Sequence, residues 1–278
     1  MSPFFLSPPR TRSTVLYELT ANYVKQKYGL LEIKNHSELF LQFNSSVVVT
    51  NHRVNQTFPT EMIPLVYDDC IHMHFIYPYM FKNLKERNLH KLDVLRQEKE
   101  NGRNYHIKGT LQVSETPKEI IEFFSDRHFV ITKRRNTLDQ LLSLLYAKET
   151  RQFTVRQLDN SMRTHAENLS NGVVISDYEE VARAVIKQSQ AIYNLESVIH
   201  DKGLTCSVVY YEDLNTTEKI FTALSTILDD ASWHHSLPND YENNLVIDMK
   251  MDYSKAIVNY EEVKSKLLDL IEEYQFYV

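Results

Sequence analysis

The sequence predicts an α/β fold: a three-layer sandwich whose central, mainly parallel sheet of about five strands has helices on both faces. Short apolar and β-branched runs at residues 4–6, 129–132 and 206–211 have the length of buried strands. They alternate with longer segments whose apolar residues recur every three or four positions, as in amphipathic helices. Parallel strands need such helical crossovers, so the alternation indicates a parallel sheet.

The first predicted elements are a strand, a tight loop and a helix. Residues 4–6 are apolar, and the prolines that follow end this run too early for a helix. From Ser13 apolar residues recur at helical spacing, and Gly29 stands where a C-terminal cap belongs. The middle of the chain is less regular. Its candidate elements are strands or buried loops at 47–49 and 62–67, a helix-prone segment at 81–100 and a short strand at 105–107.

The second half of the chain has the clearest alternation of strands and helices. A helix starts at Pro117 and ends near residue 125, and the strand at 129–132 follows it. A helix follows the junction at 133–135 and runs to about residue 150. Further helices are predicted at 177–200, 216–228 and 253–274, with the strand at 206–211 among them. The chain contains no internal repeat, low-complexity segment or clear linker, so we expect a single domain over residues 1–278.

Composition disfavours several classes of protein. The formal net charge of −6 argues against a general nucleic-acid binder, so we expect no nucleic-acid partner. No apolar run approaches the roughly 20 residues that span a bilayer, and the short apolar start lacks a signal-peptide core. Cys70 and Cys206 are too few for a disulfide framework and lack metal-ligand spacing. We therefore expect a cytoplasmic protein without a membrane span or a metal, and the sequence indicates no oligomeric state.

The loop between the first strand and the first helix has the features of a phosphate site. Unpaired N–H groups at a helix start attract anions. The loop adds guanidinium and hydroxyl groups from Arg10, Thr11, Arg12, Ser13 and Thr14. The Gly-x4-Gly-Lys-Ser/Thr pattern of a Walker loop is absent. A second interpretation is that Ser13 or Thr14 only caps the helix while the arginines face water.

A second basic cluster follows the strand at 129–132. Residues 133–135 are Lys-Arg-Arg, and Ser143 lies eight residues after Arg135, a little over two helical turns. Arg135 and Ser143 are therefore candidates for one side of a second phosphate site, although a solvated basic turn is the alternative. Both clusters follow presumed parallel strands, and α/β sheets bind ligands at that edge.

These motifs resemble those of sulfotransferases that use 3′-phosphoadenosine-5′-phosphosulfate (PAPS). Residues 9–14, Pro-Arg-Thr-Arg-Ser-Thr, are similar to the 5′-phosphosulfate loop of that family. Residues 130–143, with Arg135, Asp139 and Ser143 in register, resemble its 3′-phosphate motif, and residues 208–214 resemble its late strand with a Tyr-Glu-Asp-Leu ending. The nearest resemblance is to the bacterial and phage group related to trehalose sulfotransferase. Residues 40–104 match nothing specific.

The resemblance implies a P-loop NTPase-like fold and a role for each matched residue. Arg10 would contact the bridging and sulfuryl oxygens, and Ser13 and Thr14 would hold the 5′-phosphate. Arg135 and Ser143 would hold the 3′-phosphate, and residues 250–253 would lie over the nucleotide. Arg12 replaces the usual loop glycine, so it would be strained if that position needs a positive φ, and it would add an anion contact.

The general base is the least determined part of the predicted site. His36-Ser37-Glu38 resembles the segment after the first helix in trehalose-type relatives, where a glutamate acts as base. Glu38 is the first candidate and needs desolvation to raise its pKa. His36 is the second and titrates near neutrality without a shift. Both are equally consistent with ordinary surface residues.

The expected function is transfer of a sulfuryl group from PAPS, without a metal, to a hydroxyl of a small acceptor such as a carbohydrate or glycolipid. Residues 30–104 would form an insertion region on the acceptor side. The alternative is a catalytically inactive nucleotide-binding or partner-binding protein on the same fold. A kinase is a third option, and the missing Walker lysine argues against it.

Overall fold

The structure is a computed structural model of the whole chain. The described residues are 3–8, 10–12, 15–16, 19–20, 23, 63–67, 70–74, 108–109, 117–150, 171–176, 178–231, 233 and 251–274. Within 63–74 and at 108–109 the description covers the path of the backbone. Ser13, Thr14, His36 and Glu38 lie outside the described residues, as does most of the predicted insertion region at 30–104.

The described part of the chain is α/β with a parallel sheet, as the sequence predicts. The sheet has the strand order β4 (Lys108–Gly109), β1 (Pro3–Leu6), β5 (His128–Lys133) and β6 (Cys206–Tyr210). Every neighbouring pair in it is parallel. Four strands are described here, so the predicted count of about five is not reached within the described residues. The segments β2 (Ile63–Tyr67) and β3 (Cys70–His74) form a separate antiparallel pair.

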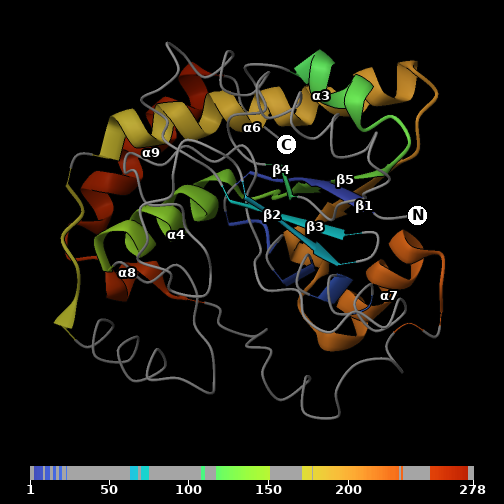
Figure 1. Cartoon of the computed structure of the whole chain (residues 1–278). Helices are drawn as coiled ribbons and strands as arrows, with labels where there is room; N and C mark the ends of the chain where they lie inside the picture. Colours follow the sequence, from blue (N-terminus) through green and yellow to red (C-terminus); the bar gives the residue numbers. More distant parts are fainter. Residues whose placement is uncertain are drawn as a thin grey trace.

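One face of the sheet is covered by α7 (Thr217–Leu228) and by helical residues near the start of the chain (Figure 1). Phe5, Val130 and Val209 from three neighbouring strands share a buried cluster with Leu16 and Leu19 and with the apolar side of α7. The fully buried Trp233 closes this cluster. Because alternate residues of a strand face opposite sides, the neighbouring residues Phe4 and Phe129 face the other side of the sheet.

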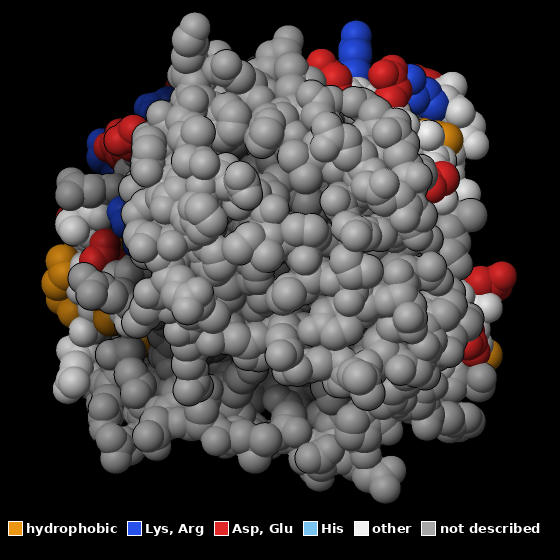
Figure 2. Space-filling model, viewed as in Figure 1, with side chains coloured by type: hydrophobic (Ala, Val, Ile, Leu, Met, Phe, Trp, Pro, Cys, Tyr) orange, Lys and Arg blue, Asp and Glu red, His pale blue; other side chains and the backbone are white. Residues whose placement is uncertain are grey.

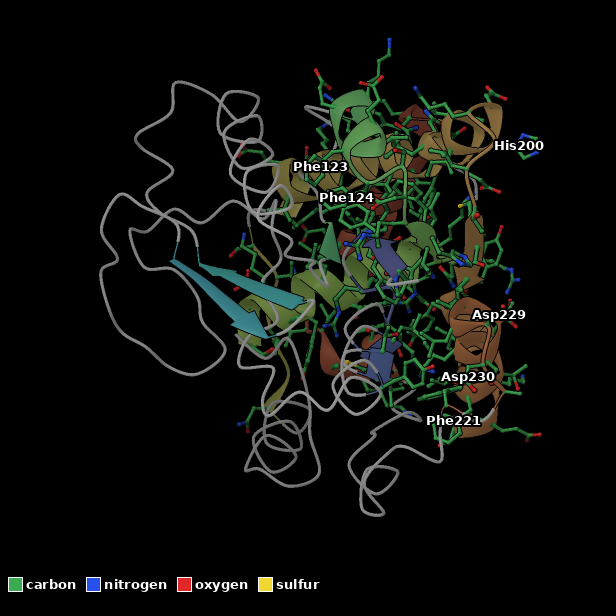
Figure 3. The ribbon with its side chains drawn as sticks, turned by 45° about the vertical axis from the view of Figure 1, so that its right-hand side comes forward. Phe123, Phe124, His200, Phe221, Asp229 and Asp230 are labelled. Atoms are coloured by element: carbon green, nitrogen blue, oxygen red, sulfur yellow. The ribbon has the colours of Figure 1, made fainter. Side chains whose placement is uncertain are left out.

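Both ends of α7 are capped locally. The Thr216 hydroxyl accepts a hydrogen bond from the Lys219 N–H (3.3 Å), which is the usual role of an N-cap threonine. At the other end Asp229 adopts the left-handed conformation, with φ 50°. The next residue, Asp230, is labelled in Figure 3 beside Asp229. It accepts a hydrogen bond from the Tyr23 hydroxyl (2.6 Å), which ties the end of α7 to the first helix.

The other face of the sheet is covered by α3 (Pro117–Phe123) and α6 (Tyr178–Asp201), with α4 (Thr137–Thr150), α8 (Tyr253–Ala256) and α9 (Tyr260–Glu273) beside them (Figure 1). Phe4 on β1 stacks on Phe124 at the end of α3, with ring centroids 4.2 Å apart. Phe129 meets the same Phe4 ring edge-on. Apolar residues of α4, α6, α8 and α9 form one continuous buried cluster. Helices therefore pack on both faces of the described sheet.

The described surface is mixed in charge. Figure 2 shows acidic and basic side chains interspersed along the visible described rim. Among the described helices, none is both long enough and apolar enough to cross a membrane.

Candidate functional site

The candidate site lies where β1, β5 and β6 end. These strands are adjacent and parallel, so the segments that follow them meet at one edge of the sheet. The segments are the loop at residues 7–12, the turn at 134–136 and the 3₁₀ turn η3 (Tyr211–Asp213). This edge is where α/β sheets place their ligand sites, because the loops there are free to vary.

The loop after β1 is held to β5 by a buried threonine. The Thr11 hydroxyl bonds to the Pro8 carbonyl (2.9 Å) and to the Thr132 hydroxyl (2.6 Å). The first helix starts immediately after the loop, since the N–H groups of Val15 and Leu16 both donate to the Arg12 carbonyl. The loop therefore leads directly into a helix start, as the sequence predicts.

Two arginines of this loop have left-handed backbone conformations. Arg10 has φ 63° and Arg12 has φ 57°. For a residue with a Cβ this region costs about 1–2 kcal/mol. Arg12 stands where the resembled family has glycine, and its φ is positive in this structure. The backbone strain that the sequence predicts for a positive φ at this position therefore applies to Arg12. Strain of this kind is concentrated at functional sites and persists where the surroundings fix it.

Arg10 reaches across the edge to α4. Its Nε donates to the hydroxyl of the buried Ser143 (2.8 Å), and Ser143 is also hydrogen-bonded to the hydroxyl of Tyr253 on α8. Burial lowers the pKa of the Arg10 guanidinium from its ordinary value, because the charged form loses water. Burial likewise raises the pKa of Tyr253. Arg10, Ser143 and Tyr253 thus form a connected polar group between the loop and two helices.

Arg134 is the buried cation of the site. Its side chain is only 5% exposed, and one of its terminal nitrogens donates to the Arg10 carbonyl (3.2 Å). Its Nε is buried and has no hydrogen-bond partner among the residues that the structure describes. No carboxylate of the described residues forms an ion pair with it. A buried guanidinium is costly without an anion, so this arrangement favours an anionic ligand.

Two of the arginines lie against the ring of Tyr211. The guanidinium of Arg12 lies 4.6 Å from the ring centroid, and that of Arg134 lies 4.0 Å from it. Arg12 also donates to the Leu214 carbonyl just beyond η3. An aromatic face attracts a cation, so a single ring in the turn after β6 holds side chains from the two other segments.

The side chain of Arg135 contacts η3 and not Ser143. It is 47% exposed, donates two hydrogen bonds to the Asp213 carboxylate (2.8 and 2.8 Å) and lies over the Tyr210 ring at 4.0 Å. The bonds from Arg135 hold the pKa of Asp213 below its ordinary value. The two residues predicted to share a phosphate are therefore engaged separately here, Ser143 with Arg10 and Arg135 with Asp213.

The N-terminus of α4 is occupied by side chains of the protein. The Glu212 carboxylate accepts hydrogen bonds from the N–H groups of Arg135 and Asn136, both at 3.1 Å. The Asn136 side chain in turn accepts a bond from the Asp139 N–H (2.9 Å), which caps the helix and explains why it begins there.

The structure brings together most of the described residues that the sequence singled out. Arg10, Thr11, Arg12 and Arg135 lie at this edge, and Ser143 and Tyr253 approach it from the helices. Neither Arg134 nor Tyr211 stands out in the sequence as a candidate binding residue. Both are in segments that the sequence does single out, the basic run at 133–135 and the Tyr-Glu-Asp-Leu match, but the sequence carries no feature that separates Arg134 from Arg135.

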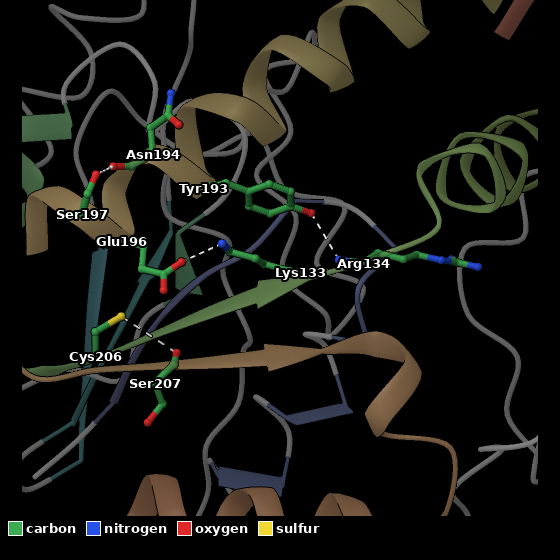
Figure 4. Close-up of polar contacts among 8 residues, drawn as sticks. All are labelled: Lys133, Arg134, Tyr193, Asn194, Glu196, Ser197, Cys206 and Ser207. Carbon is green, nitrogen blue, oxygen red and sulfur yellow. Dashed lines mark hydrogen bonds and ion pairs between the residues drawn. The ribbon is translucent and has the colours of Figure 1, made fainter. Parts of the chain in front are cut away.

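A pocket of about 450 Å³ lies beside the site, between α6 and the edge strand β6. Figure 4 shows the Lys133–Glu196 ion pair (2.6 Å) at its wall and Tyr193 between the pocket and the turn after β5. The Tyr193 hydroxyl accepts a hydrogen bond from the Arg134 N–H (3.3 Å). Burial raises the pKa of the pocket-lining Cys206 thiol to about 11. A neutral thiol is a poor nucleophile and a poor metal ligand.

The chemical groups at this edge suit an anion better than a metal ion. Within the described residues, no three His, Cys, Asp or Glu side chains gather closely enough to hold a cation. No protein-family model and no curated protein matches the chain. The arginines after β1 and β5 are therefore the features from which a function is inferred.

Proposed function

We propose that the chain is a PAPS-dependent sulfotransferase that moves a sulfuryl group to a hydroxyl of a small acceptor, of the carbohydrate or glycolipid class. The observation that carries this proposal is the pair of arginines after two adjacent parallel strands. Arg134 is buried with an unpartnered Nε, and it donates to the backbone of Arg10. The proximity of Arg134 contributes to lowering the pKa of Arg10, after the larger effect of burial.

Two neighbouring guanidinium groups repel each other, and removing them from water adds to the cost. A sulfate or phosphate group between them would offset both effects and would accept the free Nε–H of Arg134. A bound anion would therefore reduce the electrostatic cost of holding Arg10 and Arg134 close together.

The proposed donor would occupy the edge as follows. Its 5′-phosphosulfate would lie on the loop at residues 9–14, where Arg10 contacts the bridging oxygen and Ser13 and Thr14 bind the phosphate at the helix start. Arg135 and Ser143 would bind the 3′-phosphate after Arg135 leaves Asp213. The proposal includes a P-loop NTPase-like sandwich with a sheet of about five strands.

The proposed reaction is an in-line displacement at sulfur. The acceptor oxygen forms a bond to sulfur, the bond from sulfur to the 5′-phosphate oxygen breaks, and adenosine 3′,5′-bisphosphate leaves with the electron pair. Cations aimed at the leaving oxygen are each worth about 10²–10³-fold in such a reaction. Glu38, or His36 as the alternative, would take the proton of the acceptor hydroxyl, for about 10²–10⁴-fold.

The rival function is a nucleotide-binding or partner-binding protein without turnover. The observation in its favour is the ion pair between Arg135 and Asp213, because one predicted phosphate ligand is already engaged. Release of the bisphosphate from PAPS over a panel of hydroxylated acceptors separates the two. Binding without release in any reaction favours the rival.

The test of the site itself is the Arg134→Met variant, which keeps an unbranched apolar side chain and removes the guanidinium group with its charge. We expect calorimetric affinity for adenosine 3′,5′-bisphosphate to fall at least about tenfold, since a hydrogen bond to a charged group is worth about 1.5–3 kcal/mol. Without ligand, the variant should unfold at the same or a higher temperature, because a buried charge is removed.

Arg183→Met is the matched control for this test. Arg183 is a partly exposed arginine paired with Glu273 on the helices, so its loss should leave nucleotide affinity unchanged. ATP with magnesium serves as the control ligand for a kinase. Wild-type affinity in Arg134→Met, or tighter binding of ATP with magnesium than of the bisphosphate, would contradict the proposal.

A further inference from the structure

The part of the candidate site formed by the turn at 134–136 and by η3 contains two negatively charged side chains. Glu212 and Asp213 are consecutive residues of η3, and both carboxylates face the turn between β5 and α4. Between them they engage the Arg135 guanidinium and the N–H groups of Arg135 and Asn136. These are the groups that a phosphate at this turn would use.

The two carboxylates are held in different ways. Glu212 accepts two backbone N–H groups at the start of α4, where the unpaired N–H groups and the helix dipole favour a negative charge. It therefore stabilises the turn itself. Within the described part of the chain, the Asp213 carboxylate accepts its hydrogen bonds from the side chain of Arg135 and is also within the longer-range field of Lys219. Asp213 therefore holds the Arg135 guanidinium, whereas the backbone N–H groups of the turn are bonded to Glu212.

The Asp213–Arg135 pair is open to water and exchangeable. Asp213 is 58% exposed and Arg135 is 47% exposed. Exposed ion pairs of this kind contribute little to stability, because water and salt screen them. A phosphate dianion presents the same paired oxygens as a carboxylate with more charge, so it can replace Asp213 on the guanidinium fork.

We propose that Asp213 is a specificity-determining residue that competes with the ligand's second phosphate for Arg135, while Glu212 remains in place as the support of the turn. This inference rests on the proposed function, because it assigns the second phosphate of a nucleoside 3′,5′-bisphosphate to Arg135. Asp213 lowers the affinity for bisphosphates and does not act on nucleotides that carry only a 5′-phosphate. The site thereby favours ligands whose 3′-phosphate is fully ionised over those with a weaker negative group.

The test is the Asp213→Asn variant of the full chain, titrated with adenosine 3′,5′-bisphosphate and with adenosine 5′-monophosphate. We expect bisphosphate affinity to rise roughly two- to fivefold, the range of an exposed ion pair. The monophosphate should bind as it does to the wild type. In about 0.5 M sodium chloride the gain should shrink, because salt screens exposed charges.

Asp201→Asn is the control for net charge. Asp201 ends α6, is exposed, and is the same residue type, so the two variants change the charge of the protein equally. Affinity for both nucleotides should be unchanged in this variant. A gain of the same size in Asp201→Asn would mean that net charge alone is responsible, and it would overturn the inference.

The remaining outcomes separate the inference from the proposed function. If the wild type binds the bisphosphate and Asp213→Asn binds it equally or more weakly, Asp213 does not compete and the inference fails alone. A weaker variant would identify Asp213 as a group that positions Arg135 for the phosphate. If neither protein binds the bisphosphate, the proposed function fails and the inference fails with it.

Discussion

At the scale of single residues, the loop after β1 combines strain with charge. Arg10 and Arg12 both have a positive φ, and both guanidinium groups are engaged, with Ser143 and with Tyr211 and Leu214. The side-chain contacts of these arginines offset the backbone cost. A glycine at either position would relax the loop and lose the contacts.

The strain at Arg12 is measured by comparing two variants that lose the same contacts. Arg12→Ala and Arg12→Gly both remove the guanidinium, and only the alanine keeps a Cβ in the left-handed region. We expect Arg12→Gly to be more stable than Arg12→Ala by about 1 kcal/mol in urea unfolding, after the greater freedom of glycine in the unfolded chain is included. Equal stability, or a more stable alanine variant, would contradict a positive φ at this position.

The sequence identifies the residues of the site better than their partners. Residues 10–12 and Ser143 follow from their places after a strand and inside a helix. Which of Arg134 and Arg135 turns inward does not follow, because both lie beyond the strand in a turn where strand alternation no longer applies. The choice is made by Tyr211 and Asp213, about 77 residues later in the chain, and local patterns carry no information about such contacts.

At the scale of elements, β5 and β6 are joined by a side-chain contact as well as by their backbone. His128 at the start of β5 is hydrogen-bonded to the Ser207 hydroxyl (2.8 Å), at the edge of the sheet opposite to the candidate site. Burial lowers the pKa of His128 from its ordinary value of 6.5, so the folded protein keeps this ring neutral to lower pH than the unfolded chain does.

The pH dependence of stability follows from this difference. Below about pH 6.5 the unfolded chain binds a proton at His128 that the folded chain resists, so the free energy of unfolding falls as the pH falls. We expect His128→Gln to lose less stability than the wild type between pH 7 and pH 5 (roughly the range in which histidine titrates), as measured by urea unfolding at each pH. His200→Gln, which changes an exposed histidine, is the control and should retain the wild-type slope. A wild-type slope in His128→Gln would show that this histidine is not the group responsible.

Element types and positions were largely predictable where the pattern was strong. The strand predicted at 129–132 is observed at His128–Lys133. The helix predicted after the junction at 133–135, running to about residue 150, is observed at Thr137–Thr150. The β-branched run and the leucine periodicity leave few alternatives in these segments. The sequence predicts the separate β2–β3 pair only in part. It indicates a strand or a buried loop at 62–67, and it does not identify 70–74 as the partner strand.

At the scale of the whole molecule, the described chain has one hydrophobic cluster against a face of the sheet and another among helices. One contains α7 and Trp233, and the other contains α4, α6, α8 and α9. Cys206 begins β6, the edge strand of the described sheet, and lines the pocket under α6. Its exposure to reagents therefore depends on how firmly α6 and β6 stay packed.

The reactivity of Cys206 reports this packing. Its pKa of about 11, against an ordinary value of 9.0, lowers the thiolate fraction at pH 8 about a hundredfold. In a Cys70→Ser background, we expect alkylation of the folded protein to be slower than that of the urea-unfolded protein by at least about this factor. Folding and alkylation are followed together by mass spectrometry. Similar rates in the two states would mean that the edge opens freely or that the thiol is not buried.

The residues of the candidate site are far apart along the chain. Arg10 and Ser143 are 133 residues apart, Arg12 and Leu214 are 202 residues apart, and Tyr253 comes later still. Contacts across such separations form late, because long loops must close before the contacts are gained. During synthesis, these contacts therefore cannot all form until the segment that contains Tyr253 has left the ribosome. A ligand bound by these residues would stabilise polypeptides already extended beyond Tyr253 and would not assist shorter nascent chains.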